Sequence, residues 1–216
     1  MRRRILTVIV AALAVLLTVT ACSTSGDRAG SSTAPGGSIV PPDARAHNDA
    51  DVMFAQHMIP HHQQAIQMSD SVLGKQGIDP RVIQLANQIK AAQGPEIQQM
   101  QGWLSQWAKP TMPMMPSNMT PQSTMPGVPS QSGMPGMTGM SGMMSEQDIQ
   151  ALQNAQGLDA SKLFLTQMIE HHQGAITMAQ NEIKSGQYQP AIGLAHSIVT
   201  NQQQQINTMQ SILGSL

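Results

Sequence analysis

The sequence predicts an all-α fold, a four-helix bundle built from two duplicated αα-hairpins that are joined by a long crossover rich in Met, Pro and Gly. Segment 53–68 recurs about 110 residues further on as 163–178, so the chain contains an internal duplication. Apolar residues in both copies are spaced three and four apart, which is the period of an amphipathic helix. Because neither hairpin alone could bury its apolar face, we expect a single folded domain over 47–216.

The N-terminus is predicted to be a lipoprotein signal peptide covering 1–21. Three arginines precede an apolar run at 5–19, which is too short for a good membrane span. The run ends in Val-Thr-Ala-Cys, which resembles the bacterial lipobox, and Cys22 is the only cysteine of the chain. We therefore predict lipidation at Cys22, a flexible tether over 22–46, and an extracytoplasmic protein anchored to the cell membrane by its lipid.

Capping residues and periodicity place the helices in order along the chain. The four main helices are expected at about 48–73, 80–104, 159–184 and 190–213, with a short additional helix at about 146–156. Asp79 followed by Pro80 is a cap and first-turn signature, and Ser145 opens a capping sequence. Gly94-Pro95 interrupts the second helix, where we expect a kink or a restart.

The crossover from about 110 to 144 holds ten of the 18 methionines, mixed with Pro, Gly, Ser and Thr. It has no helical or strand period, so we expect a disordered loop without core residues. Two interpretations of its methionines stay open. They could collect soft metal ions, because thioethers prefer soft cations, or they could be flexible filler.

Charge and motif content argue against two classes of function. Without Arg2, Arg3 and Arg4, 8 of the 11 basic residues remain against 12 acidic ones, a balance of about −4 with no basic patch, so no nucleic-acid partner is expected. No nucleophile lies beside a base and no Gly-rich phosphate loop is present, so we do not expect an enzyme. A ferritin-like oxidase would need Glu-x-x-His repeats, but Glu170 and Glu96 are each followed by Gln at the third position.

The two copies share a Met-His pair in the middle of the apolar helix face. His62 follows Met58, and His172 follows Met168, each by one helical turn. Such a histidine can be an ordinary core residue satisfied by a hydrogen bond, or a ligand for a soft metal, and the residues alone do not choose between them. If the copies are related by a pseudo-two-fold axis, His62 and His172 should approach each other across the bundle interior.

A second group of histidines and methionines lies at the border of the same face. Its members are His57, His61 and Met68 in the first copy and His171 and Met178 in the second, where Gln167 replaces His57. Two His at i and i+4 form the geometry that helical metal sites use. We expect His61 and His171 near the groove between helices, whereas His47 and His196 are expected to be surface or capping residues.

These motifs resemble the bacterial family of domain of unknown function 305. Both halves carry its Met-Ile-x-His-His-Gln-x-Ala-Ile-x-Met core, at 58–68 and 168–178, and Gln-x-x-Glu-Ile-x-x-Met-x-x-Trp-Leu follows at 93–104. The second copy departs from the pattern at Gln205 and Ile212. The resemblance implies a ferritin-like four-helix arrangement and copper handling outside the cytoplasm, since the family includes exported copper-binding members rich in Met and His.

Two functions are therefore predicted. The first is a lipid-anchored binder of soft metal ions, copper(I) in preference to copper(II), or silver, that acts as a buffer or resistance factor. The second is a non-catalytic structural or interaction module of the cell envelope that binds no metal and has an unidentified protein partner. The candidate metal ligands are Met58, His62, Met168, His172, His57, His61, Met68, His171 and Met178.

Overall fold

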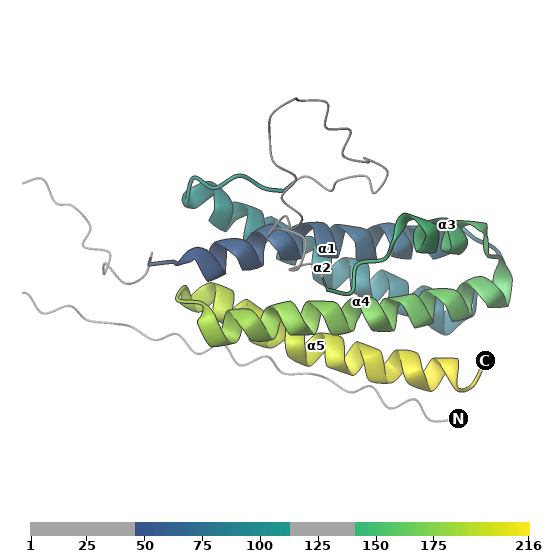
Figure 1. The fold of residues 1–216 in the computed structure, drawn as a ribbon. Coiled ribbons are helices and arrows are strands. Elements are labelled where there is room, and N and C mark those ends of the chain that lie inside the picture. Colours follow the sequence, from purple (N-terminus) through teal and green to yellow (C-terminus); the bar gives the residue numbers. More distant parts are fainter. Residues whose placement is uncertain (1–45, 113–140) are drawn as a thin grey trace, which may run out of the picture. The chain divides into compact units, whose positions relative to one another are not determined.

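The computed structural model describes residues 46–112 and 141–216, which form helices and no strand. The helices are α1 (Asp49–Leu73), α2 (Pro80–Gln106), α3 (Glu146–Asn154), α4 (Gly157–Ser185) and α5 (Gln189–Leu213) (Figure 1). This confirms the predicted all-α bundle of two hairpins, α1–α2 and α4–α5, with the short extra helix α3. The predicted signal peptide, the tether up to residue 45, Cys22 and residues 113–140 of the crossover lie outside the described residues.

Side-chain caps fix where three of the helices begin. The Asn48 side chain accepts the N–H groups of Ala50 and Asp51, and the Asp51 carboxylate accepts the N–H of Asn48, which closes a capping box at α1. Asp79 caps α2, and Ser145 forms a second capping box at α3. These caps satisfy N–H groups that a helix start leaves without intrahelical partners.

The expected restart at Gly94-Pro95 is wrong, because α2 runs through both residues without interruption. Proline removes one helical hydrogen bond and crowds the preceding turn, at a cost of about 3 kcal/mol. Buried residues on both sides of it, Gln93 and Ile97, hold the helix against its neighbours. The packing of an amphipathic face supplies most helical stability in proteins and outweighs this local cost.

The four long helices form a bundle in which α1 packs on α2 and α4, and α5 packs on α4 and α2. The start of α1 lies beside the end of α4, where the Asn48 side chain donates to the Ser185 carbonyl at 2.8 Å. The start of α4 lies beside the start of α2, where the Asp79 N–H donates to Ser161 Oγ at 3.1 Å. The end of α2 and the start of α4 therefore lie at opposite ends of the bundle, as in bundles with one long crossover (Figure 1).

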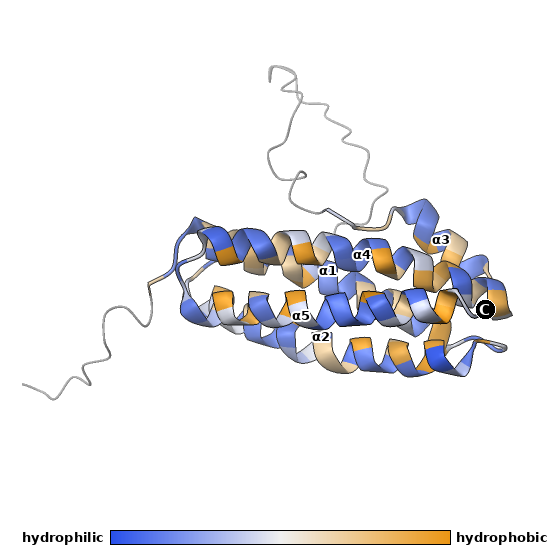
Figure 2. Cartoon of the chain, turned by 90° about the horizontal axis from the view of Figure 1, so that it is seen from below, coloured by the Kyte–Doolittle hydropathy of each residue, from blue (hydrophilic) through white to orange (hydrophobic). Residues whose placement is uncertain are grey.

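The bundle core is divided into two hydrophobic clusters, one toward each end. One contains Met68, Phe164 and Met168, and the other contains Phe54, Met58 and Met178. Hydrophobic and hydrophilic positions alternate along the helices, as amphipathic packing requires (Figure 2). Within 46–112 and 141–216, no helix combines the length and the apolar character that crossing a membrane requires.

The last residues of the crossover, 141–144, lie against α1 and α4. Gln64 binds Met144 through two hydrogen bonds, from its Nε2 to the Met144 carbonyl at 2.9 Å and from the Met144 N–H to its Oε1 at 2.8 Å. Met144 is buried in one of the hydrophobic clusters. The expectation that the crossover has no core residues is therefore wrong at this end, because Gln64 satisfies the backbone groups that burial of Met144 would leave unpaired.

Candidate metal centre

A layer of four buried histidines separates the two hydrophobic clusters. His61 and His62 come from α1, His171 and His172 come from α4, and each is at most 1% exposed. On both helices the buried apolar residues of one cluster end before this position, and those of the other begin after it. We call these residues the four-histidine layer.

The rings that meet across the interior belong to His61 and His171, with centroids 3.8 Å apart. The expectation that these two lie near a groove at the border of the apolar face is therefore wrong, since both are buried. Two features explain the difference. Helix α1 packs on α4 as well as α2, and segment 141–144 covers the surface where a border would have been.

His62 and His172 turn instead toward the second helix of their own hairpins. The Nε2 atom of His62 lies 2.7 Å from Glu96 Oε2 on α2, and that of His172 lies 2.6 Å from Gln205 Oε1 on α5. Neighbouring residues project about 100° apart around a helix, so one histidine of each adjacent pair faces the other hairpin and one faces its own.

These contacts determine which ring nitrogen carries the proton. The Nε2 atoms of His61, His62 and His172 each face an oxygen acceptor, the first being the Ser141 carbonyl at 3.2 Å. In a neutral ring Nε2 must then donate, which leaves the lone pair on Nδ1. Among the described residues those three Nδ1 atoms have no hydrogen-bond partner, and His171 has none at either nitrogen.

Burial keeps three of the four histidines neutral. It lowers the pKa of His61 to about 3, with the neighbouring His62 adding to the effect, and the pKa of His172 to about 4. The pKa of His171 is also held well below its ordinary value, by burial and then by His61. At neutral pH the imidazoles of His61, His171 and His172 retain a lone pair, which is the form that binds metals.

Methionine sulfurs flank the layer along the bundle axis. Met58 and Met168 are fully buried, each one turn from the histidines and in opposite hydrophobic clusters. Met68 and Met178 are also buried but lie two turns from the layer, about 10 Å along their helices. The structure thus does not bring His57, His61 and Met68 together. His57 lines a pocket at one end of the bundle with Met178, whereas Met68 belongs to the hydrophobic cluster on the other side of the layer.

The layer as placed offers histidine pairs and no complete cage. Within 46–112 and 141–216, no group of three or more His, Cys, Asp and Glu side chains is arranged to hold a metal ion. His196 is exposed, and His47 stacks on Trp107 with ring centroids 4.5 Å apart, so neither belongs to the layer.

Sequence reasoning missed the polar partners on the second helices. Glu96 and Gln205 occupy equivalent positions in the two copies, as do Gln93 and Gln202, which are buried with unpaired amide atoms in the described part of the chain. A signal for them existed. The duplication is offset by about 109 residues in this region, and polar residues at equivalent inward positions of both copies indicate a shared polar layer.

The chain is similar to one protein family and to several solved structures. A family model described as "Domain of unknown function (DUF305)" matches residues 51–213. A solved DUF305 protein from Streptomyces coelicolor is 31% identical with a TM-score of 0.63, covering 77% of this chain and 91% of its own. A DUF305 fragment from Deinococcus radiodurans is 30% identical with a TM-score of 0.62, covering 78% and 98%.

A further similar structure is that of CopM in its Cu(I)-bound form. It is 28% identical with a TM-score of 0.58, and the match covers 76% of this chain and 96% of CopM. CopM structures in Cu(II)-bound and Ag-bound forms match as well. None of the curated proteins matches the chain.

Proposed function

The chain belongs to the DUF305 family, and from this premise we propose that it is an exported, lipid-anchored protein that binds copper(I) or silver in the four-histidine layer. Its role is to buffer these ions or to confer resistance to them, and it performs no catalysis. The similarity to CopM, described in Cu(I)-, Cu(II)- and Ag-bound forms, supports copper and silver as the ions.

The observation that carries the proposal is the set of unpaired imidazole nitrogens in the buried core. Five ring nitrogens of the layer lack a partner among the described residues: the Nδ1 atoms of His61, His62, His171 and His172, and Nε2 of His171. A buried polar atom without a hydrogen bond costs about 1–3 kcal/mol. A bundle that needed only packing would place apolar residues there, so the cost indicates a ligand that these nitrogens bind.

The partners of the Nε2 atoms support the same conclusion. Metal-binding histidines commonly donate their other N–H to a carboxylate or carbonyl, which fixes the tautomer and the ring orientation. Glu96, Gln205 and the Ser141 carbonyl occupy these positions for His62, His172 and His61. Each leaves Nδ1 as the atom that would bind the ion.

The thioethers favour soft cations. Met58 and Met168 are the nearest sulfurs along their helices, one on each side of the layer. Thioether and imidazole ligands suit Cu(I) and Ag(I), whereas thioethers contribute little to zinc sites. The border residues His57, Met68 and Met178 stay predicted metal ligands, but outside this layer.

We expect the metal-free mature chain, beginning at Cys22, to bind Ag(I) or Cu(I) more tightly than Zn(II). Replacing both Met58 and Met168 with Leu should weaken Ag(I) binding at least tenfold and leave Zn(II) binding unchanged, because Leu preserves volume but has no sulfur. Calorimetric titration with each ion measures this difference.

The matched control replaces Met100 and Met209 with Leu. These are also duplicated and fully buried, but neither has a histidine four residues away. The control should bind Ag(I) as the wild type does. Zn(II) binding as tight as Ag(I) binding or tighter, together with Ag(I) binding that does not change in the Met58/Met168 double variant, would refute the proposal and favour the metal-free envelope module.

The lipid anchor is tested separately at Cys22. A Cys22→Ala variant cannot be acylated, so we expect it to move from the membrane fraction to the soluble extracytoplasmic fraction, or to remain uncleaved. Fractionation followed by mass spectrometry of the N-terminus measures both results. If the variant is processed and retained like the wild type, no lipid holds this chain at the membrane.

A further inference from the structure

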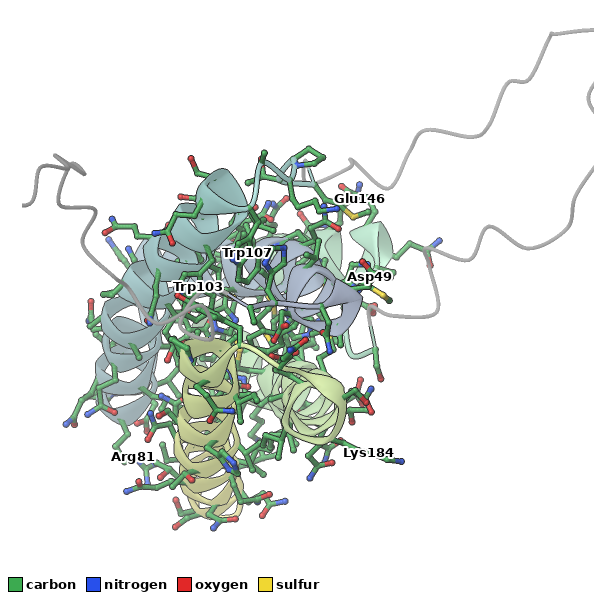
Figure 3. All side chains as sticks on the ribbon, turned by 90° about the vertical axis from the view of Figure 1, so that its left-hand side faces the viewer. Asp49, Arg81, Trp103, Trp107, Glu146 and Lys184 are labelled. Carbon is green, nitrogen blue, oxygen red and sulfur yellow. The ribbon has the colours of Figure 1, made fainter. Side chains whose placement is uncertain are left out.

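A second group of metal-ligand side chains lies at the end of the bundle where α1 begins and α4 ends. Figure 3 looks onto this end, with Asp49 at the start of α1 and Lys184 near the end of α4. A pocket of about 300 Å³ opens here between the two helices. Its lining includes Met53 and His57 from α1 and Met178 and Glu182 from α4.

Glu182 is the side chain in this pocket that packing does not explain. It is only 2% exposed, and the hydrogen-bonding group that its carboxyl faces is another acid, Asp51, with which it can share a proton; no backbone N–H or basic side chain within the described part of the chain donates to it. Its nearest acidic neighbour, Asp51, is fully buried and already accepts the backbone N–H groups of Asn48, Gln187 and Tyr188. Burial, and then Asp51, raise the pKa of Glu182 to about 8.

The duplication supplies an internal comparison. The residues equivalent to Met53, His57 and Glu182 are Leu163, Gln167 and Val72. At that end of the bundle Val72 is fully buried among apolar residues, and Gln167 donates to the Asp148 carbonyl of α3. The fold therefore accepts apolar and amide side chains at these positions, and does not itself require an acid and an imidazole.

The spacing of the pocket residues suits a metal ion. Met53 and His57 are one turn apart on α1, and Met178 and Glu182 are one turn apart on α4, so each helix presents a pair of side chains on one face. His57 is 7% exposed, and burial lowers its pKa, which favours the neutral ring. Met53 is 52% exposed and lies at the solvent side.

We propose that this pocket is a second metal site that binds a divalent cation of the Cu(II) type through the His57 imidazole and the Glu182 carboxylate, with release to solvent of the proton that Glu182 holds in the metal-free protein. The Met178 thioether is a weak additional ligand, and water completes the coordination. Imidazole and carboxylate suit Cu(II), which also tolerates a long thioether bond. The site shares no ligand with the four-histidine layer, so it does not depend on the proposed function.

The test is a calorimetric titration of the metal-free mature chain with Cu(II), accompanied by electron paramagnetic resonance of the Cu(II) complex. His57→Gln and Glu182→Val copy the residues of the other copy and should fold. Each should weaken the binding of one Cu(II) at least tenfold, and His57→Gln should remove nitrogen hyperfine coupling from the spectrum. Glu182→Gln, which keeps the shape of the side chain, should also weaken it.

Two controls separate this site from other histidines. His196→Gln removes an exposed imidazole elsewhere and should bind Cu(II) as the wild type does. His61→Leu with His171→Leu should lose Ag(I) binding yet keep the Cu(II) site, so failure of either proposal is visible by itself. Unchanged Cu(II) affinity in His57→Gln and in folded Glu182→Val or Glu182→Gln would overturn the second site.

Discussion

A Gly174→Ala variant is expected to be less stable than the wild type by roughly 2–3 kcal/mol in its free energy of unfolding. A β-carbon at Gly174 would lie 1.9 Å from the Ser141 carbonyl oxygen and 2.7 Å from the Cα of Gly142. Both are backbone atoms, so no side-chain rotation relieves the clash. Segment 141–144 would have to leave the surface of α1 and α4, with loss of the His61–Ser141 and Gln64–Met144 hydrogen bonds.

Urea denaturation followed by circular dichroism measures the effect. The control is Gly193→Ala, which lies in α5 where an added β-carbon meets nothing within 4 Å. It should gain up to about 1 kcal/mol, because alanine is the better helix former. If Gly174→Ala were as stable as Gly193→Ala, segment 141–144 would not be held where the structure places it.

The sequence predicted most of the fold because the duplicated motif carries its own boundaries. Asn48, Asp79 and Ser145 are caps that act within one turn, and the structure places helix starts beside all three. The motif did not reveal why Gly174 stands where the first copy has Gln64. In the first copy the Gln64 side chain hydrogen-bonds Met144 of the crossover. In the second copy Gly174 has no side chain, which leaves space for Ser141 and Gly142 against α4.

The orientation of the histidines could not be predicted from one helix. A helical projection gives the angle between His61 and His62, but not which neighbouring helix covers each angle. Glu96 and Gln205 were missed for the same reason, since they become partners only when each hairpin closes. The histidines as residue types were predictable, and their pairing required the packed structure.

The second large effect is expected in acid. The metal-free protein should lose stability steeply as the pH falls from the ordinary histidine pKa of 6.5 toward 4, because His61, His171 and His172 have lowered pKa values in the fold. The unfolded chain takes up protons in this range and the folded chain does not. Each such imidazole costs about 1.4 kcal/mol per pH unit, and its contribution to stability is fully present only above 6.5.

A His61→Leu and His171→Leu double variant isolates this effect. Two groups that must stay unprotonated in the fold are removed, so at pH 5 the variant should be more stable than the wild type by roughly 2–4 kcal/mol, with a smaller difference at pH 7. Urea denaturation at several pH values gives both profiles.

Protonation of Glu182 has the opposite effect on stability. The contribution of the histidines is therefore measured as a difference between the wild type and the double variant. Its pKa is raised from 4.5 to about 8 in the fold, so its contribution to stability is fully present below 4.5 and is lost as the pH rises through 8. Between 4.5 and 6.5 the two trends partly cancel in the wild type alone. Because Glu182 is the same in both proteins, the difference between their profiles reports the histidines. Parallel profiles would mean that His61 and His171 are protonated as easily in the fold as in the unfolded chain, which burial in the four-histidine layer does not allow.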